Sequence, residues 1–234
     1  MSKERHGYAR LGWESRGLSR LGRARRGLAG RVSACQGKVS TFQKRAFQMI
    51  RAKAQLESVS PYSQSQHYET PKLDRELARD YEARTWRGRI HSNSDGYVII
   101  PNTAFKNSLA EAAKYMGEQI PGKAKNTYTK HFEAGVLVVE PLTLPIKASD
   151  VQGEWLFVPS DGKRGGGKRV SKCFPRIDSW AGEVEFIIVD EIITEDVFRR
   201  TLEAAGSFIG IGRFRPRNNG FYGRFAVKSL SWVK

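Results

Sequence analysis

A segment rich in glycine and arginine, Ser207 to Phe225, joins a helix-like stretch to a strand-like one and constrains the fold more than any other part of the chain. Its sequence, SFIGIGRFRPRNNGFYGRF, has a composition that no ordinary turn requires. Glycine lets the backbone adopt positive φ and approach a ligand closely, so that successive N–H groups can converge on an anion. The residues concerned are Gly210, Gly212, Gly220, Gly223, Arg213, Arg215, Arg217, Arg224, Phe214, Phe221 and Tyr222.

These residue types together predict a clamp for a nucleic-acid backbone. Guanidinium groups are planar donors that match phosphate oxygens, and aromatic rings offer faces on which bases stack. The alternative is a long glycine-rich hairpin whose arginines only solubilise the chain.

The charge of the chain supports a nucleic-acid partner. The net charge is +16 and the pI is about 10.1, above the value at which nucleic-acid binding should be considered. Residues 1–45 carry 12 Lys and Arg against 2 Asp and Glu, so this arm holds +10 of the total. No apolar run approaches the roughly 18 residues of a membrane span, and we expect a chain without a membrane partner.

The arm, residues 1–45, is rich in Arg, Gly and Ser and contains the quasi-repeat GLSRLGRARRGLAGR. Such a segment buries too little apolar surface to offset its ordering entropy, so we predict that it is mostly disordered. Two interpretations stay open. The arm is an arginine-rich RNA tether, or Met49, at the start of a clean strand, marks the true beginning of the protein.

Cysteines and histidines indicate no metal site and no cofactor. Cys35 and Cys173 lie 138 positions apart, which is neither a disulfide framework nor a metal-binding spacing. The four histidines are scattered, without a spacing that would hold zinc. The N-terminus lacks the apolar core of a secretory signal, and a reducing cytoplasmic location is expected.

The globular part, residues 46–234, begins with a strand. Between Gln48 and Val59, apolar and charged residues alternate with period two, which predicts a half-buried strand. A polar connector follows. Pro71 then begins a predicted helix to about Arg87, with Leu73, Leu77 and Tyr81 as a narrow apolar stripe.

A second helix follows a short strand, Tyr97 to Ile100. Asn102 or Thr103 is predicted to cap it, and Phe105, Leu109, Ala112 and Met116 form its buried face. The free N–H groups of a helix start attract phosphate, so Asn102 and, on the first turn, Lys106 are candidate RNA contacts. The alternative is simply a well-capped helix.

The middle of the chain predicts a buried strand at Gly135 to Val139, then a β-hairpin insertion from Glu140 to Trp180 with a mobile basic tip. Three consecutive glycines at the tip lie among cations. The hairpin residues that we expect to contact RNA are Lys163, Arg164, Lys168, Arg169, Lys172 and Arg176.

The last third predicts a strand at residues 183–189, a helix from Thr194 to Ala205 that stops at Gly206, and a closing strand from Tyr222 to Val233. The order of elements is strand, helix, strand, strand, helix, strand. This order predicts an α+β, ferredoxin-like (RRM-like) βαββαβ fold, whose antiparallel sheet has both helices on one face and the other face open. RNA-recognition domains hold single strands on such an open face, and we expect the glycine-rich segment to lie across it.

The chain resembles the RAMP superfamily of CRISPR-associated proteins, in particular the backbone subunit that polymerises along guide RNA. Two motifs carry the resemblance. GIGRFRPRNNGFYGRF, Gly210 to Phe225, is similar to the glycine-rich loop of that superfamily, and IPNTAFKNSLAEAAK, Ile100 to Lys114, resembles its proline-initiated first helix. The positions after Pro101 have fewer glycines than the family pattern.

The resemblance implies a non-enzymatic subunit that binds single-stranded guide RNA without sequence preference and oligomerises head to tail with copies of itself and other CRISPR effector subunits. It also implies that the hairpin at about 140–180 is the family's thumb, which contacts the neighbouring subunit. Relatives encoded by phages or plasmids belong to the same resemblance. We expect affinity to fall with salt, and Arg213→Ala or Arg215→Ala to remove roughly one phosphate contact each.

Two other functions stay open. The repeat-processing branch of the superfamily is an endoribonuclease that often uses histidine, and His67, followed by Asp74, is the candidate catalytic residue here. Cleavage of repeat RNA that is lost in His67→Ala would indicate this enzyme. The third possibility is a mimic that blocks assembly of another CRISPR effector, and it would co-purify with a foreign complex.

Overall fold

The computed structural model of the protein describes residues 49–160, 165 and 167–233. Its largest sheet is antiparallel, with the strand order β4 (Val136–Val138), β8 (Ala181–Ile188), β1 (Ile50–Ser58) and β9 (Phe225–Val233). The alternation predicted for the first strand is confirmed, because every second side chain of β1 is buried. The register places Ala54 opposite Val184 of β8 and Leu230 of β9, so that apolar residues of all three strands share one face.

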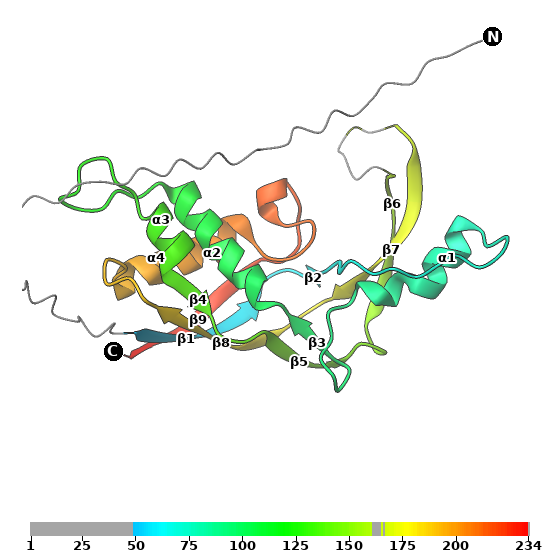
Figure 1. Cartoon of the computed structure of the whole chain (residues 1–234), viewed down its shortest axis with the longest axis horizontal. Helices are drawn as coiled ribbons and strands as arrows, with labels where there is room; N and C mark the ends of the chain where they lie inside the picture. Colours follow the sequence, from blue (N-terminus) through cyan, green and yellow to red (C-terminus); the bar gives the residue numbers. More distant parts are fainter. Residues whose placement is uncertain (1–48, 161–164, 166, 234) are drawn as a thin grey trace, which may run out of the picture. The chain divides into compact units, whose positions relative to one another are not determined.

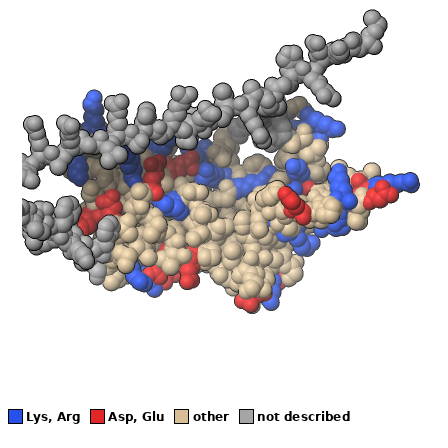
Figure 2. Space-filling view, viewed as in Figure 1, with Lys and Arg blue, Asp and Glu red and all other residues tan. Residues whose placement is uncertain are grey.

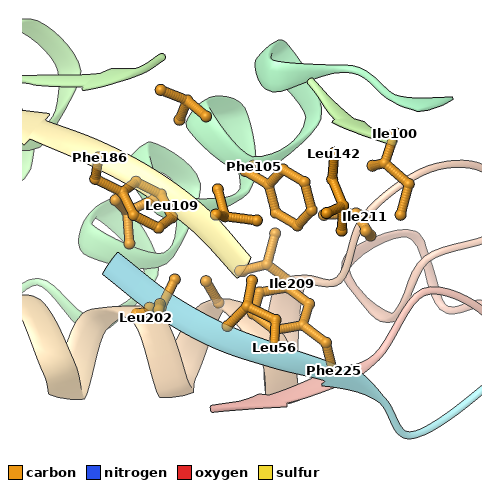
Figure 3. Close-up of a cluster of buried hydrophobic side chains, with 14 of the residues drawn as sticks. Leu56, Ile100, Phe105, Leu109, Leu142, Phe186, Leu202, Ile209, Ile211 and Phe225 are labelled. Atoms are coloured by element: carbon orange, nitrogen blue, oxygen red, sulfur yellow. The ribbon is translucent and has the colours of Figure 1, made fainter. Parts of the chain in front are cut away.

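Two helices, α2 (Asn102–Met116) and α4 (Glu195–Ala204), cover this apolar face (Figure 1). Phe186 of the sheet meets Phe198 of α4 edge to face, with ring centroids 5.2 Å apart. Figure 3 shows the shared core, in which Leu109 of α2 is fully buried. Truncation of such a leucine to alanine costs about 2–5 kcal/mol of stability.

The opposite face of the sheet is open and carries paired charges. Arg51 lies 3.1 Å from Glu185, and Lys53 lies 3.4 Å from Glu183. Both pairs are formed across β1 and β8 by side chains that point away from the core. The cations of this face are therefore largely neutralised by neighbouring carboxylates.

Two smaller sheets extend this unit. β3 (Tyr97–Ile100) and β5 (Leu142–Lys147) form a two-stranded ribbon. β6 (Gln152–Pro159) and β7 (Arg169–Ile177) form the predicted hairpin, to which the short strand β2 (Tyr62–Ser63) is added. The hairpin therefore begins later than predicted, because the residues after Glu140 pair with β3 instead.

A buried ion pair anchors the segment before β3 to the hairpin. This segment contains α1 (Ala78–Thr85) and the 3-10 turn η1 (Trp86–Arg89). Arg89 donates to the carboxylate of Glu82 at 2.5 Å, and that carboxylate also accepts from the backbone N–H of Cys173 in β7 at 2.9 Å. Removal of one partner of such a pair leaves a buried charge unpaired and destabilises the fold strongly.

The helix predicted from Pro71 to Arg87 is wrong in its first half. Leu73 and Leu77 are 60% and 69% exposed, and α1 begins only at Ala78. Arg75 has a positive φ of 58°, which a helix cannot contain. The carboxylate of Glu76 holds this loop by accepting hydrogen bonds from Arg84. These bonds are the main reason why the pKa of Glu76 is lowered to about 2.

The later helix also ends differently from its prediction. Thr194 does cap α4, because its hydroxyl oxygen accepts from the N–H of Val197. Gly206 does not stop the helix: a π-helical turn, η2 (Ala205–Ile209), continues it to Gly210. π turns are rare and are frequently found at functional sites.

Other boundaries differ by a few residues. A helix that the sequence did not predict, α3 (Thr129–Gly135), precedes β4, and the closing strand begins at Phe225 instead of Tyr222. The predicted arm, residues 1–45, with Cys35, lies outside the described residues. Lys163 and Arg164 of the hairpin tip lie outside them as well.

Candidate nucleic-acid interface

The connector, which we define as residues 207–224, is a folded structure that leaves η2 and returns to β9. Ile209 and Ile211 are buried in the core and fix its start. Gly220 lies against its own chain, because a Cβ added there would come within 1.8 Å of the backbone oxygen of Phe214. A Cβ on Gly223 would come within 1.9 Å of the backbone oxygen of Ile211. The glycines thus allow the connector to fold back on itself.

From the sequence we expected the backbone N–H groups of the connector to converge on an anion. Instead they donate to oxygens of the protein. Arg213 N–H donates to the oxygen of Ser63 at 2.7 Å, and Gly223 N–H donates to that of Pro61 at 2.8 Å. Others donate within the connector, including Gly220 N–H to the oxygen of Arg215 at 3.0 Å. Gly210 and Gly212 have the predicted positive φ, at 72° and 73°.

Arg213 is half-buried, and its guanidinium group packs against two aromatic rings. Its guanidinium carbon lies 3.0 Å from the ring centroid of Phe174 in β7 and 3.8 Å from that of Phe214. Burial lowers the pKa of Arg213 to about 10, with a smaller contribution from nearby Arg89. One terminal nitrogen, Nη1, is buried and has no hydrogen-bond partner among the described residues. This arginine therefore joins the connector to the hairpin.

Arg215 and Arg217 both pair with one carboxylate on α2. Arg215 Nη2 lies 2.9 Å from Glu111 Oε2, and Arg217 Nε lies 3.0 Å from Glu111 Oε1. Arg224 donates to the backbone oxygens of Ser207 and Phe221, each at 3.3 Å. Of the four arginines predicted to grip phosphates, Arg213, Arg215 and Arg217 thus fasten the connector to the hairpin and α2, and Arg224 fastens it to itself. Arg217 is about half exposed.

A second tie joins the connector to the hairpin. The Tyr222 hydroxyl donates to Glu154 of β6 at 2.7 Å, and burial, together with this bond, raises the pKa of Tyr222. Arg176 pairs with Asp178 at 2.7 Å and with Glu154 at 3.5 Å. Arg176 is therefore another structural residue.

The remaining hairpin cations are free in the part of the chain that the structure describes. Lys172 lies two residues from Phe174 and so projects from the same face of β7, where it lines a cleft together with Tyr68 and Arg89. Lys168 and Arg169 are exposed nearer the tip, where Arg169 lies 6.0 Å from the ring of Phe157. No ion pair of a described residue involves these three cations.

The start of α2 offers less to a ligand than predicted. Pro101 is the cap residue, and Asn102 donates weakly to the backbone oxygen of Val138 at 3.4 Å. Lys106 donates to the backbone oxygens of Phe132 and Glu133 at 2.6 and 2.8 Å, and burial lowers the pKa of Lys106. Its ammonium group therefore stabilises the end of α3.

A row of aromatic rings, exposed except for the half-buried Tyr222, follows the connector, and the sequence did not indicate it as a unit. Tyr115 of α2 stacks on Phe208 with ring centroids 5.6 Å apart. Tyr222 meets Phe214 and Phe221 edge to face at 6.3 and 6.0 Å. Arg224, bonded to the carbonyls of Ser207 and Phe221, links the two groups. We call Tyr115, Phe208, Phe214, Phe221 and Tyr222 the aromatic row.

The connector does not lie across the open face of the sheet, so this expectation was wrong. Its partners are α2, the hairpin and residues 61–63, which places it on the helix-bearing side between α2 and β7 (Figure 1). Figure 2 shows blue side chains between α2 and the hairpin, with red carboxylates among them. The connector lies on this side because Ile209 and Ile211, at its start, are buried in the core beneath α2.

His67 has no arrangement suited to acid–base catalysis. Its side chain is 87% exposed, and its one described polar partner is Glu69, at 3.4 Å. It lies at the rim of a cleft of about 670 Å³ that Tyr68, Glu82, Arg89 and Lys172 also line. Within the described part of the chain, no cluster of His, Cys, Asp and Glu could hold a metal ion, and no helix is long and apolar enough to cross a membrane.

Comparisons with known proteins give similarities in structure only. No protein-family model and no curated protein matches the sequence. The chain is similar to a Type III-B Cmr-beta bound to cognate target RNA, with 10% identity over 80% of this chain and 61% of that chain, at a TM-score of 0.43. Cmr6 from Pyrococcus furiosus is similar at 13% identity over 76% and 98% of the two chains, at a TM-score of 0.42.

A CRISPR RNA-guided surveillance complex is also similar, with 10% identity over 78% of this chain and 67% of that chain, at a TM-score of 0.36. Each of these structures is less than 25% identical to the chain.

Proposed function

We propose that this protein binds single-stranded RNA along the aromatic row and the neighbouring hairpin cations. The observation that carries the proposal is the exposure of these rings. Phe208, Phe221 and Tyr115 are 55%, 63% and 57% exposed, although aromatic side chains are usually buried in the core. Exposed aromatic rings beside cations are typical of surfaces that stack bases and hold a phosphate backbone.

The arrangement suits a single strand better than a duplex. Bases of a single strand are free to stack on protein rings, whereas those of a duplex are already stacked on each other. Lys168, Arg169 and Lys172 lie on the hairpin that the connector contacts at Phe174 and Glu154. They have no acidic partner among the described residues, so they can neutralise successive phosphates.

The finer proposal is a backbone subunit that coats guide RNA in a CRISPR-type ribonucleoprotein. It is supported by the resemblance of residues 210–225 and 100–114 to RAMP motifs. It is also supported by the strand order β4-β8-β1-β9, which is the order expected of a ferredoxin-like split βαβ fold. In this proposal the β6–β7 hairpin is the thumb, and copies associate head to tail along the RNA.

Binding of a fluorescein-labelled 20-mer of oligouridylate, measured by anisotropy at several salt concentrations, tests the proposal. We expect log K to fall linearly with log salt, and Lys172→Gln to reduce the slope by about 0.7, the value of one contact to a single strand. Lys53→Gln, on the open face, is the matched control and should leave the slope unchanged. Binding that is insensitive to salt, or equal changes in both variants, would contradict the proposal.

The roles of two connector arginines can be separated in the same assay. Arg215→Ala is expected to flatten the salt slope modestly, because only 24% of the Arg215 side chain is exposed. Arg213→Ala is expected to lower the free energy of unfolding by about 2 kcal/mol, since it removes packing against Phe174 and Phe214. Urea denaturation measures this loss.

A further inference from the structure

A hollow of about 590 Å³ lies over the outer surface of α2, beside the aromatic row. Lys106, Glu111, Lys114 and Tyr115 line it from α2, because residues three or four apart share one side of a helix. Arg217 of the connector closes one side. Glu133, at the end of α3, lies at another side.

The rim of this hollow carries the stacked pair Tyr115–Phe208. The rings are inclined by only 30° and lie 5.6 Å apart, and both side chains are more than half exposed. Two different elements position them. Tyr115 stands in the last turn of α2, and Phe208 stands in the π turn η2, whose bond from Gly210 N–H to the oxygen of Ala205 measures 2.7 Å.

The π turn matters because it decides where Phe208 points. An α-helix continued through Gly206 would advance each side chain by 100°, whereas the wider turn adds a residue and shifts the later ones around the axis. In the observed arrangement Ile209 enters the core while Phe208 remains outside against Tyr115. The exposed pair is thus fixed by the backbone of both helices.

We propose that the hollow and the Tyr115–Phe208 pair hold one nucleotide of the bound RNA. The base stacks on the exposed ring faces, and its phosphate lies between Lys114 and Arg217. This inference rests on the proposed RNA-binding function and extends it to a site that the sequence analysis did not include, since neither Tyr115, Phe208 nor Lys114 belongs to the predicted contacts.

The charges in the hollow distinguish a nucleotide from other ligands. Lys114 is exposed and makes no ion pair with any described residue, whereas Lys106 is occupied by two backbone oxygens. Glu111 is occupied by Arg215 and Arg217. The Glu133 carboxylate makes no described ion pair, so it can accept a hydrogen bond from a sugar hydroxyl or a base amino group. A nucleotide fits this set of side chains, because it has a planar base, an anionic phosphate and several hydrogen-bond donors. An acidic peptide would use only the cations of the hollow, and it would leave the Glu133 carboxylate and the aromatic rings without a partner.

Three variants of Tyr115 test the stacking. Tyr115→Ala is expected to weaken binding of the oligouridylate 20-mer about tenfold, which corresponds to about 1.4 kcal/mol, because the base loses the ring on which it stacks. Tyr115→Phe keeps the ring and should bind like the wild type, whereas Tyr115→Leu keeps apolar surface without a planar face and should resemble the alanine variant. Since the side chain is 57% exposed, all three are expected to fold.

Leu137→Ala is the matched control, because Leu137 is 50% exposed on the sheet face that lies opposite the helices. Lys114→Gln should lower the salt slope by about 0.7, and Lys53→Gln should not change it. Photo-crosslinking with an oligouridylate that contains 4-thiouridine provides a direct readout. We expect crosslinked peptides to include Tyr115 or Phe208.

The outcomes separate this inference from the function on which it rests. If the wild type binds the RNA but Tyr115→Ala and Phe208→Ala bind within twofold of it, and crosslinks lie only elsewhere, the nucleotide site is wrong and the proposed function stands. If the wild type binds no RNA at any salt concentration, both proposals fail. A loss of binding in Tyr115→Ala that Tyr115→Phe restores supports both.

Discussion

The open face of the sheet and the connector surface expose charged side chains to similar degrees, but they differ in the groups that accompany them. On the open face, Arg51 and Lys53 each pair with a glutamate of β8, and the exposed apolar side chains Leu137 and Val233 are aliphatic. On the connector surface, exposed aromatic rings lie between arginines and lysines. A strand of RNA could be attracted weakly by the first surface, but it could stack only on the second.

The difference shows that an open sheet face does not by itself make an RNA-binding surface. RNA-recognition domains use such a face because their strands present aromatic side chains there. In this protein the outward positions of β1 are Arg51, Lys53, Gln55 and Glu57, and none of them is aromatic. The exposed aromatic rings lie instead on the connector and at the end of α2. The connector can take its folded-back shape only because it is rich in glycine.

The first prediction tests whether this shape is required, and it has the largest expected effect. Gly220→Ala places a methyl group 1.8 Å from a backbone oxygen and 2.2 Å from its carbon, neither of which can move independently. We expect a loss of about 3 kcal/mol in the free energy of unfolding, measured by urea denaturation. RNA affinity should fall with it.

Gly167→Ala is the control for the loss of a glycine. It lies in the hairpin tip, and a Cβ there would meet no atom within 4 Å. We expect its stability to change by less than about 0.5 kcal/mol. If the two variants were equally stable, the connector would be more pliable than its packing indicates, and its shape would no longer distinguish it from the open face.

Much of the fold could be predicted because its signals are local. The alternation in β1 and the apolar stripe of α2 repeat within a few residues, and Thr194 caps the helix that follows it. The same locality misled the analysis at Leu73 and Leu77. Leu73 and Leu77 do have the spacing of a helix. However, the carboxylate of Glu76 accepts hydrogen bonds from the N–H of Leu73 and the side chain of Arg84, and these bonds favour a loop.

The candidate site could be located in the sequence but its contacts could not. The glycine-rich composition identified the connector. The partners of its arginines, however, stand far away in the chain: Glu111 is on α2 and Phe174 is on β7. Periodicity contains no information on such pairs. Tyr115 and Phe208 escaped notice for the same reason, since their stacking depends on a π turn that no local pattern announced.

A second prediction compares the surfaces by their affinity for RNA. Phe221→Ala removes a ring that is 63% exposed and should weaken binding of the oligouridylate 20-mer by about 2 kcal/mol, or some thirtyfold. Leu137→Ala, on the open face, should leave the affinity unchanged. Anisotropy titrations at one fixed salt concentration measure both. A loss in Leu137→Ala as large as that in Phe221→Ala would show that RNA lies on the sheet.

The smallest effect concerns the carboxylate that holds two connector arginines. Glu111→Gln removes the anion that pairs with Arg215 Nη2 and Arg217 Nε, so these nitrogens also become available to phosphate, in addition to the parts of Arg217 that are already exposed. We expect RNA affinity to rise by about 1 kcal/mol, roughly fivefold, at low salt, and the gain to disappear at high salt because exposed charges are screened. Titrations at two salt concentrations measure the change.

Glu185→Gln removes the same charge from the open face, where Glu185 pairs with Arg51. It raises the net charge of the protein by the same amount, so any gain that it produces reports the general attraction of the RNA to a more basic protein. The difference between the two variants therefore isolates the local effect of freeing Arg215 and Arg217. Equal gains in the two variants would mean that the effect of a charge on RNA affinity does not depend on its position in the protein. The two surfaces would then differ only in their aromatic side chains and not in their electrostatics.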